Sequence, residues 1–288
     1  MTLELNTRIL IVGLGLIGGS YAKALKKKGF HVSAIDTRQD TIDYALERGI
    51  IDEGYTEPVK EAFDRAELLI FALYPDVFLT FVCEHQHQFR KNAVLTDVTG
   101  VKGCIVYEIQ AMLRDDLEFI AAHPMAGREV YGVENSDDRI FQNANYIVVP
   151  TDKNSPDAIA LCKMLGAVLG FSRISTLSPE EHDEMIAFVS QLTHVIAISL
   201  MTCSDHTHLA DYTGDSFRDL TRIARINDTM WSALFDLNKD ALLRQMDIFE
   251  KEFNTLRKIL EQGDIAAMRE KMQLSTARRA QFDKKQNH

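Results

Sequence analysis

The sequence is poor in cysteine, and the cysteines it has are scattered. The four of them form no CxxC pair: Cys83, Cys104, Cys162 and Cys203. Disulfide frameworks and structural zinc sites need closely spaced sets of such residues, so we expect neither. This usage is typical of a protein that works in a reducing cytosol.

Long apolar runs and an excess of positive charge are also missing. The N-terminus, MTLELNTRIL, has no basic region followed by an apolar stretch. No window approaches the roughly 20 apolar residues of a membrane span. The 42 acidic residues outnumber the 32 Lys and Arg, giving a formal net charge of −10. Because such a surface repels phosphate backbones and anionic lipids, we expect no nucleic-acid or membrane partner and a cytoplasmic location.

What the first part of the chain does contain is an alternation of short apolar runs and helical segments. The runs are RILIV (8–12), HVSAID (31–36), ELLIFALYP (67–75), NAVLTD (92–97), EFIAA (118–122) and NYIVVP (145–150). The first two helical segments end at Gly29 and Gly49, which suit helix C-termini. Buried strands alternating with helices predict a parallel sheet covered on both faces, the doubly wound α/β (Rossmann) fold.

Beyond about residue 176 the pattern is helical only. Ser178, Pro179 and Glu181 form a capping-box start of a helix. Apolar residues then recur at i, i+3/i+4 spacing, at positions 242, 243, 246, 249, 253, 256, 259 and 260. The sequence therefore predicts an α/β domain at 1–176 and an all-helical domain at 177–288. We expect a homodimer, because one chain cannot cover such long apolar faces.

A glycine-rich loop joins the first predicted strand to the first helix. GLGLIGG places Gly13, Gly15 and Gly18 in GxGxxG spacing. In this context the first glycine permits a tight turn, the second lets the backbone approach a pyrophosphate, and the third lets the helix pack on the strand. The helix N-terminus, with Leu16 and Ile17, then offers free N–H groups. The pattern predicts a dinucleotide site.

An acidic residue accompanies this loop. Asp36 ends the second predicted strand, 21 residues after Gly15, where its carboxylate can accept from the ribose hydroxyls of the cofactor. A carboxylate there repels a 2′-phosphate and favours NAD. Arg38 offsets part of that repulsion if it is not simply a solvated loop charge, so NADP remains open.

A histidine follows the fifth apolar run, in the stretch AAHPMAGRE (121–129). We expect His123 at the carboxyl end of a strand, where doubly wound folds bind ligands. Pro124 fixes the backbone, and Ala126 and Gly127 leave room for a ligand. A lone histidine is more often structural, but this placement favours an acid/base group facing the nicotinamide.

An arginine cluster lies in the helical part. SFRDLTRIARINDTMW carries three arginines within two helical turns, near Trp231: Arg218, Arg222 and Arg225. They form either a solvated basic face with Asp215 and Asp219 as partners or a clamp for a carboxylate.

Several of these motifs together resemble one family. The glycine-rich start, DVTGVKG, HPMAG, EEHDEMIAFVSQLTHVIA and FRDLTRIA followed by MW are similar to the prephenate dehydrogenase family, including its arogenate-using relatives. The resemblance runs over roughly residues 8–260, and the combination of HPMAG with FRDLTRIA is specific. Because the chain stops without an obvious regulatory or mutase extension, it resembles the catalytic core alone.

The resemblance implies an activity and roles. The activity is oxidative decarboxylation of prephenate to 4-hydroxyphenylpyruvate, on the route to tyrosine. His123 would accept the proton of the ring hydroxyl, an effect of about 10²–10⁴ in rate. Arg222 would hold the ring carboxylate, His194 would line the substrate pocket, and Trp231 would wall it.

The chain also departs from the family pattern. Where the family commonly shows D-x-x-S-x-K, this chain runs from Asp97 to Lys102 with Gly100 in place of the serine. Thr99 is adjacent and is our candidate for the lost substrate contact. The common S-x-L-P-H appears as SQLTH, ending at His194.

Other histidines carry weaker signals. His182 with Asp183 matches a family position at the start of the long helix, where capping, an interdomain hydrogen bond and substrate contact all remain open. Cys203, His206 and His208 are metal-binding residue types, but no second ligand cluster accompanies them, so we expect no metal.

Three alternatives to prephenate dehydrogenase remain. An arogenate dehydrogenase needs an acid for the substrate ammonium, such as Asp228 or Asp215. A dehydrogenase of hydroxy or imino acids is disfavoured by HPMAG, because those families use another catalytic group. A dinucleotide-sensing protein would bind NAD and tolerate replacement of His123.

Overall fold

The computed structural model describes residues 3–205 and 207–282. The chain packs as two units, Met1–Asn238 and Lys239–His288. The first unit contains both β-sheets and all helices up to α11. The second consists of α12 (Lys239–Glu261), α13 (Ile265–Arg279) and the short turn η6 (Ala280–Phe282).

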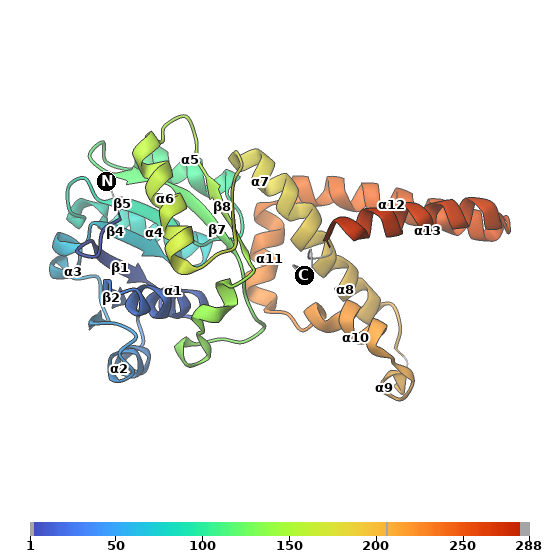
Figure 1. The fold of residues 1–288 in the computed structure, drawn as a ribbon, viewed down its shortest axis with the longest axis horizontal. Coiled ribbons are helices and arrows are strands. Elements are labelled where there is room, and N and C mark those ends of the chain that lie inside the picture. The colour runs from blue at the N-terminus through green and yellow to red at the C-terminus, as the bar shows by residue number, and fades with distance from the viewer. Residues whose placement is uncertain (1–2, 206, 283–288) are drawn as a thin grey trace, which may run out of the picture. The chain divides into compact units, whose positions relative to one another are not determined.

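The larger sheet of the first unit has six parallel strands in the order β3-β2-β1-β4-β5-β6 (Figure 1). These strands are β1 (Arg8–Val12), β2 (His31–Ile35), β3 (Glu53–Tyr55), β4 (Leu68–Phe71), β5 (Val94–Asp97) and β6 (Glu118–Phe119). This is the strand order of the Rossmann fold, in which ligands bind where the order reverses, here between β1 and β4. The predicted fold class is confirmed.

Helices cover both faces of this sheet. One face carries α1 (Leu16–Lys27), α2 (Gln39–Glu47) and α6 (Pro156–Leu169). The other carries α3 (Lys60–Arg65), α4 (Pro75–His85) with the turn η1 (Gln86–Gln88), and α5 (Gly103–Met112). Successive strand residues point to opposite faces, so Ile9 and Ile11 join the first core and Leu10 and Val12 the second.

A second, three-stranded sheet has the order β7-β8-β9. It comprises β7 (Ala121–Met125), β8 (Asn145–Val149) and β9 (Arg173–Thr176), with the turns η2 (Val133–Asn135) and η3 (Asp138–Phe141) between the first two strands. β7 is antiparallel to β8, which runs parallel to β9. The expectation that every apolar run joins one parallel sheet is therefore wrong here.

The position expected for His123 is also corrected. It lies in the middle of β7, opposite Ile147, rather than after the end of a strand. The prediction ended the strand with the apolar run EFIAA, whereas the pairing with β8 continues it through Pro124 to Met125. β7 is an edge strand, where a residue without an N–H is tolerated.

All regular structure described beyond Thr176 is helical, as predicted. It comprises α7 (Pro179–Ile186), the π-helical turn η4 (Ala187–Gln191), α8 (Leu192–Thr202), α9 (Leu209–Tyr212), α10 (Asp215–Thr221), the turn η5 (Arg222–Ala224), α11 (Asp228–Leu237), and the helices of the second unit. The capping box is confirmed: Ser178 Oγ accepts from the Glu181 N–H at 3.2 Å, and Glu181 Oε2 accepts from the Ser178 N–H at 2.9 Å.

One helix has the length and composition of a membrane span. The continuous helix Pro179–Thr202 has an 18-residue window with a mean hydropathy of 1.7, of which 28% is buried. The expectation that no window approaches such a span is wrong for this segment, because residues 185–201 contain no Asp, Glu, Lys or Arg. A single helix of this kind is weak evidence, since core helices of soluble proteins pass the same test.

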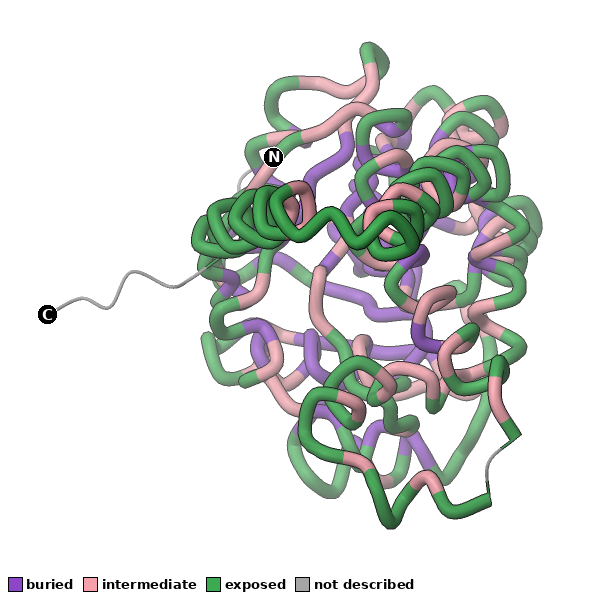
Figure 2. The backbone as a smooth tube through the Cα atoms, turned by 90° about the vertical axis from the view of Figure 1, so that its right-hand side faces the viewer, coloured by how far each residue is buried: buried purple, intermediate pink, exposed green. Residues whose placement is uncertain are grey.

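The tube in Figure 2 is largely buried along the strands and largely exposed along α12 and α13. Within the second unit, Lys271 Nζ pairs with Glu252 Oε1 at 2.7 Å between the two helices. Exposed apolar side chains remain on this pair, among them Ile248, Phe249, Phe253, Leu260, Ile265 and Met272.

Candidate active site

Two glycines of the loop leave no space for a side chain, whereas the third does. Gly13 has a φ of +93°, and a Cβ there would lie 2.5 Å from the Ala72 carbonyl oxygen. A Cβ on Gly18 would collide with the carbonyl oxygen of Gly13. A Cβ on Gly15 would meet no protein atom within 4 Å. Gly13 and Gly18 therefore shape the turn, and open space adjoins Gly15.

The N-terminus of α1 offers its N–H groups at this opening. Gly15 is the N-cap residue and supplies no side-chain acceptor, and Leu16 and Ile17 form the half-buried start of the helix. Orphan N–H groups and the helix dipole at such an end suit a phosphate. The loop therefore fits the pyrophosphate of a dinucleotide.

Asp36 lies beside the loop, directly after β2. Its Oδ2 accepts from the Leu14 N–H at 2.8 Å, and its Oδ1 accepts from the Arg38 N–H at 3.0 Å. These bonds fix the carboxylate, whose remaining lone pairs suit ribose hydroxyls. The Arg38 side chain is exposed, with Nε 4.0 Å from Asp40 Oδ1.

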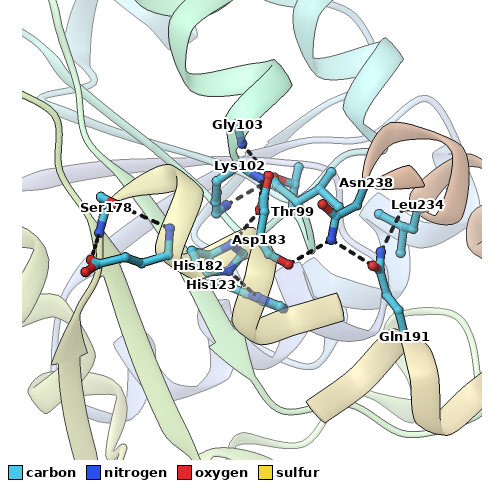
Figure 3. Close-up of polar contacts among 12 residues, drawn as sticks. Thr99, Lys102, Gly103, His123, Ser178, His182, Asp183, Gln191, Leu234 and Asn238 are labelled. Atoms are coloured by element: carbon cyan, nitrogen blue, oxygen red, sulfur yellow. Dashed lines mark hydrogen bonds and ion pairs between the residues drawn. The ribbon is translucent and has the colours of Figure 1, made fainter. Parts of the chain in front are cut away.

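His123 is held by a second histidine. Its Nδ1 lies 2.9 Å from Nε2 of His182, and His182 Nδ1 lies 2.8 Å from Oδ1 of Asp183 (Figure 3). His182 is fully buried, whereas His123 is half-buried. β7 thus contributes His123, and α7 contributes His182, which bonds to it, and Asp183, which bonds to His182.

Burial keeps both rings neutral. It lowers the pKa of His123 well below 6.5, and the neighbouring His182 and the Lys102 cation lower it further. Burial also lowers the pKa of His182, against the opposing effect of its bond to Asp183. A neutral imidazole can accept a proton, which an imidazolium cannot.

A buried ion pair lies next to the histidines. Lys102 Nζ is 2.6 Å from Asp97 Oδ2, and both side chains are fully buried. The Thr99 hydroxyl bonds to the same carboxylate and to the Val101 carbonyl, and it accepts from Lys102 at 3.1 Å. Because its hydroxyl is used inside the protein, this placement of Thr99 does not favour the predicted substrate contact.

Gly100, His123 and α11 lie close together. A Cβ on Gly100 would be 4.0 Å from Nε2 of His123 and 3.5 Å from Leu234. Trp231 lies one helical turn before Leu234, and its ring stacks on that of His194 with centroids 3.6 Å apart. The predicted substrate residues His194, on α8, and Trp231, on α11, are therefore brought together, and α11 also contacts Gly100.

Arg222 lies close to His194 and to the segment after β7. It donates to Glu129, six residues after His123, at 2.5 Å, and both charges influence His194. Arg218 instead pairs with Asp215 at 2.8 Å on the surface. For this residue, the structure agrees with the alternative of a solvated basic face.

Sequence reasoning missed three polar residues around the site. Glu129 carried no prediction, although it lies two residues after HPMAG. The amide of Gln191, in the π-helical turn, bonds to the Leu234 carbonyl at 2.9 Å and to Asn238 at 2.7 Å. Asn238 also donates to the Asp183 carbonyl at 2.9 Å (Figure 3). No sequence signal marks this pair, because its partners are far apart in the chain.

Within residues 3–205 and 207–282, no group of three or more His, Cys, Asp or Glu is arranged to hold a metal ion. His206, considered above with Cys203 and His208, lies outside the described residues.

A neutral histidine close to a dinucleotide loop suits the removal of a hydroxyl proton while the carbon that bears it is oxidised. The fold and this site define the class as a dinucleotide-dependent dehydrogenase.

Comparisons with known proteins narrow the class. The family model for the prephenate dehydrogenase nucleotide-binding domain matches residues 21–170, and that for the prephenate dehydrogenase dimerization domain matches residues 178–274. Prephenate dehydrogenase of Bacillus subtilis is 32% identical over 274 residues, covering 91% of this chain and 72% of the relative. Cyclohexadienyl dehydrogenase of Zymomonas mobilis is 28% identical, covering 89% of each chain.

A solved structure agrees over nearly the whole chain. Prephenate dehydrogenase from A. aeolicus, in complex with hydroxyphenyl propionate and NAD+, has a TM-score of 0.89 and 29% identity, covering 98% of this chain and 100% of that one. The chain belongs to the prephenate dehydrogenase family and is an oxidoreductase.

Proposed function

We propose that this protein catalyses the NAD-dependent oxidative decarboxylation of prephenate to 4-hydroxyphenylpyruvate, a step of tyrosine biosynthesis. The observation that carries the proposal is the His123 imidazole, bonded through Nδ1 to His182 and close to Gly100 through Nε2. The B. subtilis and Lactococcus lactis relatives, both prephenate dehydrogenases, support the substrate.

The cofactor is NAD, as family membership and the A. aeolicus complex with NAD+ support. The residues fit it: Gly13, Gly15 and Gly18 shape the loop, and Leu16 and Ile17 begin the helix that faces the pyrophosphate. Asp36 binds the ribose hydroxyls and disfavours a 2′-phosphate. Arg38 stays a surface residue at the rim of this site.

Each substrate-facing residue has one task. NAD, when bound, supplies the acceptor for the hydride that leaves the ring carbon. His123 accepts the proton of the hydroxyl on that carbon through Nε2, which lets the carbonyl form. Arg222 binds the ring carboxylate, a charge-assisted contact worth about 1.5–3 kcal/mol, until it leaves as CO2.

His194 and Trp231 form a flat wall for the substrate ring. The Nδ1–H of His194 donates to the Ser190 carbonyl at 2.9 Å, which leaves Nε2 as an acceptor. The Thr99 hydroxyl, predicted to contact substrate, acts through Asp97 and Lys102 instead. The arogenate alternative is weaker, because one acid considered for its ammonium group, Asp215, is engaged with Arg218.

We keep the proposed bounds of 1–176 for the nucleotide-binding domain and 177–288 for the substrate and dimerisation domain, which the matched ranges 21–170 and 178–274 support. The two packing units divide the chain later, after Asn238. The matched dimerization domain and the exposed apolar side chains Met185, Phe188 and Val189 support a homodimer. The cysteines that the structure describes are all free, which suits the cytoplasm.

The experiment is a nicotinamide reduction assay with the purified protein, crossing prephenate and arogenate with NAD and NADP. Turnover with prephenate and NAD, at a kcat/KM at least about tenfold above the other three pairings, is the expected result. Turnover only with arogenate would replace the substrate. NAD binding without turnover in all four would favour a dinucleotide sensor.

A further inference from the structure

The histidine pair ends a chain of hydrogen bonds that starts at the N-terminus of α5. Asp183 Oδ1 accepts from the Lys102 N–H at 2.8 Å, and Oδ2 accepts from the Gly103 N–H at 2.7 Å. α5 has no side-chain cap of its own, so a carboxylate from α7 caps it from outside. Because an N–H can only donate, both Asp183 oxygens are acceptors.

This fixes the proton on His182. Its Nδ1 faces Oδ1 of Asp183 at 2.8 Å, so Nδ1 carries the hydrogen. The ring is neutral, and Nε2 therefore holds a lone pair. That lone pair faces Nδ1 of His123 at 2.9 Å, so His123 must be the donor (Figure 3).

We infer that His182 and Asp183 are positioning residues that hold His123 as its Nδ1–H tautomer, so that Nε2 is always the base. The inference rests on the proposed function, because it assigns the base of that reaction. The hydrogen bond at one ring nitrogen decides the state of the other. Without an acceptor at Nδ1, the Nε2–H form of His123 is populated, and it presents a donor where the substrate hydroxyl needs an acceptor.

The charges around the pair are accounted for. Lys102, in the loop after β5, acts on both histidines, and its charge is balanced by Asp97, the last residue of β5, at 2.6 Å. Asp183 is the remaining carboxylate, and three donors share it. The hydrogen-bond chain Asp183–His182–His123 therefore has one arrangement of protons in which every donor meets an acceptor.

The test compares two substitutions at His182. His182→Gln keeps an acceptor at the place of Nε2 and can still receive the His123 Nδ1–H. His182→Asn reaches only the place of Nδ1, so it keeps a bond to Asp183 and loses His123. We expect kcat with prephenate and NAD to fall about tenfold or more in His182→Asn and to stay within about threefold of wild type in His182→Gln, with KM little changed in both.

A spectroscopic readout separates positioning from a loss of stability. The ¹⁵N shifts of the histidine rings in the full-length protein distinguish the two tautomers. We expect wild-type His123 and His182 as Nδ1–H forms, a rise of the Nε2–H form of His123 in His182→Asn, and the same rise for His182 in Asp183→Ala. Ser178→Ala, which removes the α7 N-cap, is the control: it lowers Tm and leaves kcat and the tautomers unchanged.

A wild-type kcat in His182→Asn, an equal loss in both His182 variants, or a wild-type His123 with its hydrogen on Nε2 would each overturn the inference. Absence of prephenate turnover in the wild-type protein would instead overturn the proposed function. The tautomer assignment would still test the hydrogen-bond chain in that case.

Discussion

Arg222 and Glu129, 93 residues apart in the chain, form an ion pair with Nη1 2.5 Å from Oε1. Glu129 follows the β7 strand that carries His123, and Arg222 is the residue proposed to bind the ring carboxylate. A carboxylate that binds Arg222 therefore competes with Glu129, which already occupies Nη1. The side chains are 65% and 41% exposed, so solvent screens the pair to about 1 kcal/mol or less.

Glu129→Gln is expected to lower the KM for prephenate about two- to fivefold, because the competing carboxylate is gone and the pair it replaces is weak. The measurement is steady-state kinetics at low and high salt, with the difference shrinking at high salt. Arg222→Ala is the opposite change and should raise KM strongly. A higher KM in Glu129→Gln would mean that Glu129 orients Arg222 rather than competing for it.

His123→Asn is expected to reduce turnover by about 10²–10⁴ while NAD binding stays the same, because the base is removed and the glycine loop is untouched. Single-turnover kinetics and a cofactor titration check the two halves separately. Normal turnover in this variant would remove His123 from catalysis.

The glycines of the loop offer a matched pair. Gly15→Ala should fold normally, within about 0.5 kcal/mol of wild type, because its Cβ meets no protein atom. It should weaken NAD binding, because the Cβ fills the space next to the proposed pyrophosphate. Gly18→Ala should destabilise the fold by about 1–3 kcal/mol, since its Cβ collides with the Gly13 carbonyl. Thermal unfolding and a cofactor titration would show whether the two effects separate in this way.

Stability should fall as the pH drops below about 6.5, the ordinary value for histidine. Burial lowers the pKa of His123, His182 and His194, so in this range the unfolded chain binds protons that the folded chain does not. The free energy of unfolding then falls by up to about 1.4 kcal/mol per pH unit for each of His123 and His182, and by less for His194, which solvent screens in part.

Urea titrations between pH 7.5 and 4.5 measure this slope. The carboxylates with a lowered pKa, such as Asp137 at about 2, lose most of their contribution below this window, so the slope between pH 7.5 and 5 reports the histidines. His182→Gln, which removes one of the three groups, should give a shallower slope. An unchanged slope in that variant would argue against a buried neutral His182.

The buried pair of Lys102 and Asp97 gives a stability prediction. Lys102→Met should lower the free energy of unfolding by about 3–5 kcal/mol, because it leaves the Asp97 carboxylate buried and unpaired. Adding Asp97→Asn should recover part of that loss. The backbone N–H of Lys102, which caps onto Asp183, is the same in both variants. Urea unfolding measures both, and a single variant as stable as wild type would contradict the prediction.

Local sequence signals predicted the parts of the fold that depend on local physics. The order of strands and helices, the capping box at Ser178, and the positive φ of +90° at Gly29 follow from residues close in the chain. The glycine loop and Asp36 were also found, because their spacing is set by one strand, one turn and one helix.

Tertiary contacts decided the rest. His123 was identified from its motif, but the argument that a strand ends before it was wrong, because β7 pairs with β8 across a long connection. Thr99 and Lys102 were interpreted as residues of a polar loop, but both are buried. Asp97 makes their burial possible, because its carboxylate bonds to the Thr99 hydroxyl and pairs with the Lys102 cation. The role of Asp183 was out of reach, because its partners Lys102 and Gly103 lie about 80 residues earlier.

Because Asp183 lies on α7 and caps α5, the proposed reaction requires residues 177–238 to be packed against the Rossmann domain. A chain in which 177–238 has opened locally would retain the glycine loop, Asp36 and the whole Rossmann sheet, and so its cofactor site. It would lose the acceptor that keeps the His123 hydrogen on Nδ1, and His123 would then populate both the Nδ1–H and the Nε2–H tautomer. Such a molecule would hold its cofactor and yet be unable to act on it, so cofactor binding alone is no measure of the competent fraction.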